Sequence, residues 1–243
     1  MTDWLTYEWE HEGRPAVFRV DLQYWDLLPV LAYSQLIYVS CAPKNPGSGF
    51  SKGDEHLIAS LRSALSQQLE GHAVFTGNVR FDDLEQLYYY TSDPALINHV
   101  SATCRQYSKL QTICGCIHEP HFATYYRFLF PDDAKLQSVE NRALVDRTIK
   151  RGGDLRLVRR IELEMAFLSR DDCIDFAAQI KRVGFTVGSM SMVSGGTHPY
   201  RVSIFGYSTL ELHELNRFTA RAIGIAAKYD GLLEKLDAPF IRA

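Results

Sequence analysis

Cysteine and histidine side chains gather in one short segment, residues 114–121, which reads CGCIHEPH. If this segment is an extended strand, Cys114, Cys116 and His118 share one face because side chains alternate, and His121 follows the next turn. Thiolates and imidazoles are ligands that zinc and copper prefer. The four residues therefore form a candidate metal site. Their spacing is not that of a common zinc module, and the alternative is a central strand that buries two small thiols.

The same segment could also supply a nucleophile. Cys116 could be activated by His118 or His121, as in enzymes that use a thiolate. The sequence offers no third group that would orient the base, and nothing around the thiol would favour its ionised form. We therefore predict no catalytic residues, no cofactor and a non-enzymatic protein. A metal- or thiol-dependent enzyme remains the alternative.

A second group of residues is suited to contact with another protein. Arg159, Arg160, Glu162 and Glu164 occupy the polar positions of a predicted strand in the second half of the chain. Oppositely charged side chains on one sheet face can give a partner surface its specificity. The alternative is a solvated face with cross-strand ion pairs of little energetic value. The first domain or a second copy of the chain could also cover this face.

The elements around this strand predict a small layered domain. Ile161, Leu163, Met165 and Phe167 alternate with polar residues, which is the period of a half-buried strand. Ser169 followed by Asp172 is typical of a helix start, and an apolar stripe follows it. The pattern continues as two strands (185–192 and 200–207), a long helix with a predicted capping box at Ser208 and Glu211, and an edge strand (232–240). The order is β-α-β-β-α-β, a ferredoxin-like unit that we assign to residues 155–243.

The first half predicts a separate domain, residues 1–150. Two strands at the start and another at 36–41 precede an apolar helix near residues 57–69, and 73–81 and 84–91 form a hairpin around Asp82-Asp83. Further helices, near 94–107 and 131–149, flank a strand at 111–117. We expect an α/β sandwich with a mainly antiparallel sheet, and a two-domain α+β protein as a whole. The Gly-rich turn at 151–154 is the predicted boundary.

Aromatic residues form two clusters in this first half, on segments that we expect to be strands. The residues are Tyr88, Tyr89, Tyr90, Tyr125, Tyr126 and Phe128. Such rings can stack on the bases of single-stranded RNA. They are also common in ordinary strands, and the motif of the RNA-recognition sheet is absent. A single-strand RNA binder is thus a further alternative.

Composition and charge narrow the class of protein. Net charge is −3 over 243 residues; residues 1–150 carry 13 Lys and Arg against 18 Asp and Glu, and residues 151–243 carry 13 against 11. The resulting net charges, −5 for residues 1–150 and +2 for residues 151–243, argue against a polyanion partner such as nucleic acid. No apolar run is long enough for a membrane helix, and the first residues lack the pattern of a signal peptide. Five cysteines do not suggest a disulfide framework. We expect a cytoplasmic protein.

The second half of the chain resembles the bacterial family named regulator of ribonuclease activity B. The resemblance lies in RIELEMAF (160–167), FAAQIKRVGF (176–185), YRVSI (200–204), the long last helix and Tyr229-Asp-Gly. It implies a ferredoxin-like fold and inhibition of ribonuclease E by protein contact. The family's inhibitor is acidic, whereas the second half of this chain has a net charge of +2.

Residues 1–140 resemble the bacterial domain of unknown function 695 family. The segments that carry the resemblance are AVFTGNVRF (73–81), LYYYT (87–91) with Asp93-Pro94, and YYRFLFP (125–131). This resemblance implies no activity. Together the two resemblances favour a regulatory protein that binds a protein partner, with a ribonuclease as the partner to test and a homodimer as a further form.

Overall fold

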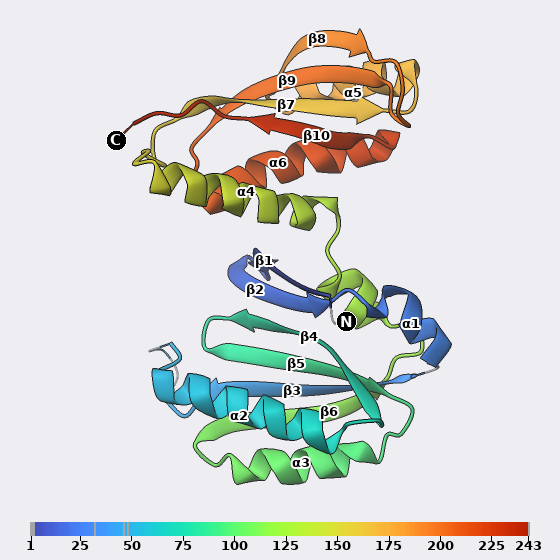
Figure 1. The fold of residues 1–243 in the computed structure, drawn as a ribbon, viewed down its shortest axis with the longest axis vertical. Helices are drawn as coiled ribbons and strands as arrows, with labels where there is room; N and C mark the ends of the chain where they lie inside the picture. Colours follow the sequence, from blue (N-terminus) through green and yellow to red (C-terminus); the bar gives the residue numbers. More distant parts are fainter. Residues whose placement is uncertain (1–2, 32, 46, 48, 243) are drawn as a thin grey trace. The chain divides into compact units, whose positions relative to one another are not determined.

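The chain divides into two compact units, Met1–Pro131 and Asp132–Ala243, in the computed structural model (Figure 1). The structure describes residues 3–31, 33–45, 47 and 49–242. Both units combine helices with an antiparallel sheet, so the predicted α+β class with two domains is confirmed. Among the described residues, no helix is both long enough and apolar enough to cross a membrane.

Unit 1 contains a six-stranded sheet in the order β1-β2-β4-β5-β3-β6, and every pair of neighbours is antiparallel. Its strands are β1 (Trp4–His11), β2 (Arg14–Asp21), β3 (Gln35–Pro43), β4 (Ala73–Phe81), β5 (Leu84–Thr91) and β6 (Leu110–His118). Its helices are α1 (Tyr24–Leu31), α2 (Lys52–Gln68), α3 (Leu96–Gln106) and the π-helical turn η1 (Thr124–Leu129). The predicted hairpin at Asp82-Asp83 is confirmed, because Phe81 pairs with Leu84.

The two faces of this sheet are covered differently. The helices α2 and α3 cover one face of the sheet (Figure 1). There they bury aliphatic side chains against β3 and β5. On the other face, η1 contributes aromatic rings: Phe128 meets Phe18 edge to face at 5.3 Å, and the Tyr125 hydroxyl donates to the Asp21 carbonyl oxygen at 2.7 Å. Segment 122–130 was expected to be a strand and is instead helical. The helical turn buries Tyr125 and Leu129 together, since residues four apart lie on one side.

Burial of tyrosines makes unit 1 sensitive to alkaline pH. Burial raises the pKa of Tyr88, Tyr89, Tyr90 and Tyr125 above the ordinary value. Above about pH 10 the unfolded chain releases these protons while the folded chain keeps them. The unfolded state then binds fewer protons, so the free energy of unfolding falls as pH rises.

We therefore expect the urea midpoint of unit 1 to decrease steeply above about pH 10. All three tryptophans, Trp4, Trp9 and Trp25, lie in unit 1, so their fluorescence reports this transition. Tyrosinate absorbance of the folded protein should show these four side chains ionising only as the unit unfolds. Ionisation of all 13 tyrosines near pH 10 in the folded state would contradict the prediction.

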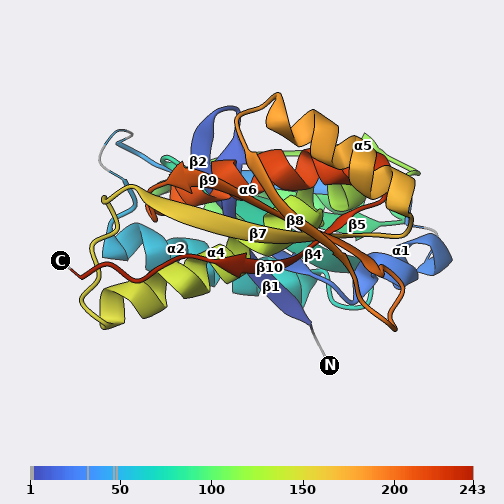
Figure 2. The same cartoon turned by 90° about the horizontal axis from the view of Figure 1, so that it is seen from above.

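Unit 2 begins with α4 (Asp133–Lys150) and continues in the predicted β-α-β-β-α-β order. The elements are β7 (Arg159–Phe167), α5 (Arg170–Lys181), β8 (Thr186–Met192), β9 (Tyr200–Ser208), α6 (Leu212–Ala226), the short turn η2 (Ala227–Tyr229) and β10 (Leu232–Asp237). The sheet order is β10-β7-β9-β8, with all neighbours antiparallel. Seen from above, β7, β9 and β10 lie in front of α6 (Figure 2).

The division between the units falls before α4, whereas the sequence indicated a boundary at 151–154. The reason is a buried polar contact between α4 and α6. The Asn141 side-chain amide donates to Asn216 Oδ1 and to Thr219 Oγ1, each at 2.9 Å. Val145 adds an apolar contact with the unit 2 core. Polar residues at buried positions weakened the apolar signal that would have assigned α4 to this unit.

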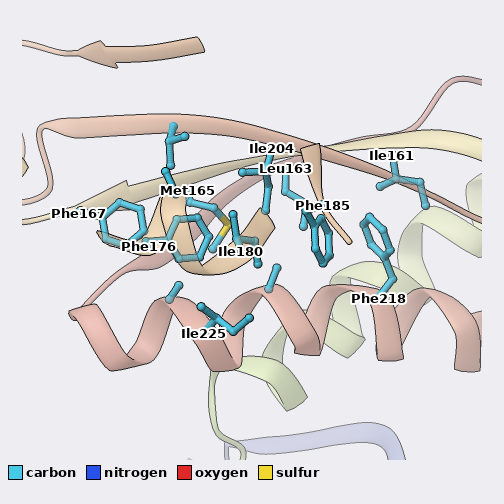
Figure 3. Close-up of a cluster of buried hydrophobic side chains, with 14 of the residues drawn as sticks. Ile161, Leu163, Met165, Phe167, Phe176, Ile180, Phe185, Ile204, Phe218 and Ile225 are labelled. Carbon is cyan, nitrogen blue, oxygen red and sulfur yellow. The ribbon is translucent and has the colours of Figure 1, made fainter. Parts of the chain in front are cut away.

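The core of unit 2 lies between the sheet and the two helices α5 and α6 (Figure 3). Ile161, Leu163, Met165 and Phe167 all point from β7 into it and are fully buried. The predicted start of α5 is confirmed, because Ser169 Oγ accepts the Asp172 backbone N–H at 3.1 Å. The predicted capping box at Ser208 and Glu211 is wrong. Glu211 itself precedes the first turn of α6 and makes no side-chain cap.

Candidate functional site

The strand β7 presents its polar residues on the sheet face opposite α5 and α6. Arg160, Glu162 and Glu164 alternate with the buried apolar residues, and each side chain is about half exposed, at 50%, 46% and 43%. Pairing with β9 places Tyr207, Phe205 and Ser203 directly beside them. We call the surface formed by Arg160, Glu162, Glu164, Arg201, Phe205, Tyr207 and Glu234 the open face.

Electrostatic contacts order the side chains of the open face. The Arg160 guanidinium lies 3.8 Å from the centre of the Phe205 ring and 3.3 Å from Glu162 Oε2. Arg201 contacts Glu234 Oε1 at 2.5 Å and Glu164 Oε1 at 3.8 Å. Cation–π stacking and ion pairs of this kind hold long side chains in defined positions. The open face is therefore a mixed-charge surface whose side chains hold one another in place.

Aromatic residues on this surface were missed in the sequence. Tyr207 is 69% exposed, and Phe205 is partly exposed beneath Arg160. The signal was present, because residues 200–207 alternate between the outward positions and buried Val202 and Ile204. Tyrosine and arginine are the residues that most often dominate the binding energy of protein interfaces.

Arg159, predicted to belong to the partner surface, is buried and does not reach it. Its guanidinium donates to the carbonyl oxygens of Pro239 at 3.1 Å, Leu157 at 3.2 Å and Asp154. Burial lowers the pKa of Arg159, and the nearby Asp154 partly opposes this effect. The strand period placed Arg159 on the buried face, where it fixes the chain segments that flank the sheet.

Replacing Arg159 with methionine should lower the free energy of unfolding of unit 2 by about 1–3 kcal/mol, because three partly buried hydrogen bonds from its guanidinium are lost. Unit 2 has no tryptophan, so amide hydrogen exchange of β7 and β9 is the suitable measurement. The matched control is Arg160→Met at the adjacent exposed position, which should change stability by less than about 1 kcal/mol. Equal effects of the two substitutions would contradict the structural role of Arg159.

The cysteine–histidine segment forms the edge strand β6 and the turn after it. Cys114 and Cys116 pack against the α2–α3 core, whereas His118 is exposed and its Nδ1 lies 3.0 Å from Gln35 Nε2. His121 is exposed in the turn that follows. Within the residues that the structure describes, no group of three or more His, Cys, Asp or Glu side chains could hold a metal ion.

The thiols near this strand are poorly suited to nucleophilic chemistry. Burial raises the pKa of Cys104 to about 12, with the adjacent Cys114 thiol adding to the effect. Burial likewise raises the pKa of Cys41 to about 12 and raises that of Cys116. A thiol must ionise to act as a nucleophile or a metal ligand. The geometry thus favours the prediction of a strand that buries its thiols over a thiolate site.

The aromatic clusters are also largely internal. Tyr88, Tyr89 and Tyr90 are 7%, 1% and 0% exposed, and Tyr125 is fully buried. Stacking of RNA bases requires accessible ring faces. These tyrosines therefore do not form a stacking platform on the surface of unit 1.

The structure defines a two-unit α+β protein in which a cation–π contact and ion pairs hold the exposed side chains of the open face. The chain belongs to the family of unknown function DUF695, whose model matches residues 2–130. The model of the family Regulator of ribonuclease activity B matches residues 126–235, which include α4 and the whole open face up to Glu234. Both predicted resemblances are confirmed.

Comparison with curated proteins gave no match. Among solved structures, an unknown protein from Galdieria sulphuraria matches at 8% identity with a TM-score of 0.22, covering 85% of this chain and 98% of that one. A candidate transcriptional repressor of the glycine cleavage system matches at 12% identity with a TM-score of 0.22, covering 86% of this chain and 98% of that one.

Proposed function

We propose that this protein regulates a ribonuclease by direct contact, and that the open face of unit 2 makes the contact. The observation that carries the proposal is exposed Tyr207 beside Arg160, which stacks on Phe205. All three residues lie on paired strands within the segment that matches Regulator of ribonuclease activity B. Pre-ordered aromatic and arginine side chains lose little conformational entropy on binding. Such residues form the energetic centre of many protein interfaces.

The element order and sheet order of unit 2 support a ferredoxin-like classification as part of this proposal. In that arrangement, helices cover one sheet face and leave the other for a partner. Arg160, Glu162 and Glu164 carry over from the sequence prediction, and Arg201, Phe205, Tyr207 and Glu234 extend it. The mixed charges of the face suit a partner surface that itself carries both signs.

The test is inhibition of a purified bacterial ribonuclease E by the full-length protein, with a fluorescent RNA substrate. Tyr207→Ala and Arg160→Glu should each raise the half-inhibitory concentration at least about tenfold. Asp175→Lys is the matched control, since it reverses a charge on the exposed side of α5, and it should leave inhibition unchanged. Normal inhibition by both open-face variants would rule out this surface.

Two measurements separate direct contact from the alternatives. If this protein sequesters the RNA instead, inhibition should disappear as the concentration of the RNA substrate is raised, and the protein should bind the RNA in the absence of the ribonuclease. Sedimentation of the free protein tests for a homodimer through the same face. A dimer that Tyr207→Ala dissociates would show that a second copy occupies this surface.

A further inference from the structure

Unit 1 contains a pocket of about 680 Å³ that the proposed function does not use. It lies between the second half of α2 and the strands β1, β4 and β5, and the first residue of α1 also borders it. Among the residues that the structure describes, no lysine, arginine or histidine lines the pocket, whereas five aromatic residues do: Trp4, Tyr24, Tyr33, Phe75 and Tyr89. Its volume is in the range that small-molecule sites occupy.

Three of the aromatic rings form one wall of the pocket. The centres of the Trp4 and Phe75 rings are 5.5 Å apart, and their planes are tilted by 37°. The centres of the Phe75 and Tyr89 rings are 4.9 Å apart, with a tilt of 39°. The face of an aromatic ring is electron-rich, so it attracts a positive charge as well as apolar groups. A wall of this kind suits a cation that is carried on an apolar body.

Asp21 brings a buried negative charge to the pocket. The residue is 1% exposed, and its carboxylate accepts hydrogen bonds from the backbone N–H groups of Asp3 and Gln23 and from the Gln23 side chain. It forms no ion pair within the described part of the chain. Burial and then the charge of Asp21 raise the pKa of Tyr24, so this charge acts on a second ring of the lining. Buried charges are usually paired, and a cationic ligand would supply the partner.

The end of α2 adds further negative charge. Gln67, Leu69 and Glu70 line the pocket where this 17-residue helix ends, and its last turn contains no basic residue. The last carbonyl groups of a helix lack intrahelical partners and give this end a partial negative charge. Glu70 is exposed beside them. This side of the pocket therefore favours a cation over an anion.

Two arginines near the pocket carry the opposite charge but do not line it. The Arg19 guanidinium stacks on the Trp4 ring, 4.3 Å from its centre, and Arg62 faces the buried carboxylate of Glu85 at 3.8 Å. The contact of Arg19 shows that the Trp4 ring accepts a cation, and it leaves Phe75 and the tyrosines of the lining for a ligand. Because Arg62 is matched by Glu85, the two carboxylates of the lining outnumber the single charge of Arg19.

We propose that this pocket binds a small organic cation, with its ammonium group at Asp21, Tyr24 and the end of α2 and its apolar body against Phe75 and Tyr89. Primary amines and quaternary ammonium compounds both present this chemistry, since the carboxylates recognise the charge and the rings recognise the apolar body. The site lies in unit 1 and uses no residue of the open face. The proposal therefore goes beyond ribonuclease regulation and can fail without affecting it.

The test is isothermal titration calorimetry of the full-length protein with two matched sets of probes. Tryptamine, indole-3-ethanol and indole-3-acetate share one ring system and are positive, neutral and negative at neutral pH. Choline and 3,3-dimethylbutan-1-ol form a second pair that differs in charge at a quaternary centre. At least one cation should bind at least about tenfold more tightly than its neutral counterpart, and indole-3-acetate should bind more weakly than indole-3-ethanol. The better of the two cations identifies a primary amine or a quaternary ammonium as the recognised group.

Matched variants locate the binding. Asp21→Asn should weaken the better cation about tenfold, whereas Asp82→Asn, in an exposed ion pair with Arg14, should not. Glu70→Gln should weaken it about threefold, whereas Glu12→Gln, in the other exposed ion pair of Arg14, should not. Tryptophan fluorescence on urea titration checks that each variant folds. Glu70 is exposed, so its variant keeps the test valid even if Asp21→Asn fails to fold.

Three outcomes would overturn the proposal. The first is the absence of binding of either cation at about millimolar concentration, the weak end of specific affinities. The second is equal affinity for the cation and its neutral counterpart in both sets, which would show an apolar pocket without recognition of charge. The third is unchanged affinity in correctly folded Asp21→Asn and Glu70→Gln proteins, which would place the ligand elsewhere.

Discussion

Replacing Phe176 with alanine is expected to lower the free energy of unfolding of unit 2 by about 3–5 kcal/mol. Phe176 is fully buried on α5, and its ring lies 4.9 Å from that of Phe167 on β7. The truncation removes apolar surface from the core and leaves a cavity between helix and sheet that close-packed neighbours cannot fill. No other change in α5 removes as much buried volume.

Hydrogen exchange of the β7 and β9 amides measures this loss without interference from unit 1. The control is Ile174→Ala on the same helix, where the side chain is 44% exposed and the expected loss is below about 1 kcal/mol. Tryptophan fluorescence, which reports unit 1, should show an unchanged transition for both variants. A Phe176→Ala protein with full protection of β7 would contradict the assigned core.

Replacing Glu85 with alanine should lower the free energy of unfolding of unit 1 by about 3 kcal/mol. The carboxylate is 1% exposed and accepts hydrogen bonds from Arg80 and from Asn78, with Arg62 at 3.8 Å. Its removal takes the acceptor from the buried Asn78 amide and the ion-pair partner from Arg62, and it leaves Arg80 with the exposed Glu55. Removing one partner of a buried ion pair lowers the free energy of unfolding by more than the intact pair contributes to it.

Glu55 provides the control, because it contacts the same Arg80 guanidinium at 2.6 Å from an exposed position. Glu55→Ala should cost less than about 1 kcal/mol, as exposed ion pairs do. Urea unfolding followed by tryptophan fluorescence measures both variants. Equal losses would show that burial does not decide the role of Glu85.

Strong local patterns made much of the fold predictable. The alternation in 160–167 fixed β7, and the turn at Asp82-Asp83 fixed the β4–β5 hairpin, because side-chain period and turn chemistry are local properties. The helix α1 was not predicted, since Tyr24–Leu31 has a single charged residue, Asp26, and therefore no polar face that would reveal the helical period. The helical turn at 124–129 was mistaken for a strand because its aromatic residues favour strands in isolation.

The candidate sites show a clearer limit. Alternation placed Arg160, Glu162 and Glu164 on one surface correctly, but the partners Arg201 and Glu234 come from other strands, and only the sheet register brings them together. In unit 1, the contacting rings of Trp4, Phe75 and Tyr89 come from three strands, β1, β4 and β5. Spacing along the chain cannot show which distant residues will become neighbours.

The strand order of unit 1 has a consequence for the folding of the nascent chain. β3 lies between β5 and β6, and both of these neighbours follow it in the sequence. During synthesis, Leu36, Ile37 and Val39 leave the ribosome before either neighbour is made, so β3 gains β5 as a partner only when the chain reaches Thr91 and gains β6 only when it reaches His118. Unpaired apolar strands are the segments from which aggregation starts. The completion of β6 is therefore the step that ends the exposure of β3, and slow translation between residues 40 and 118 would increase the demand for chaperones.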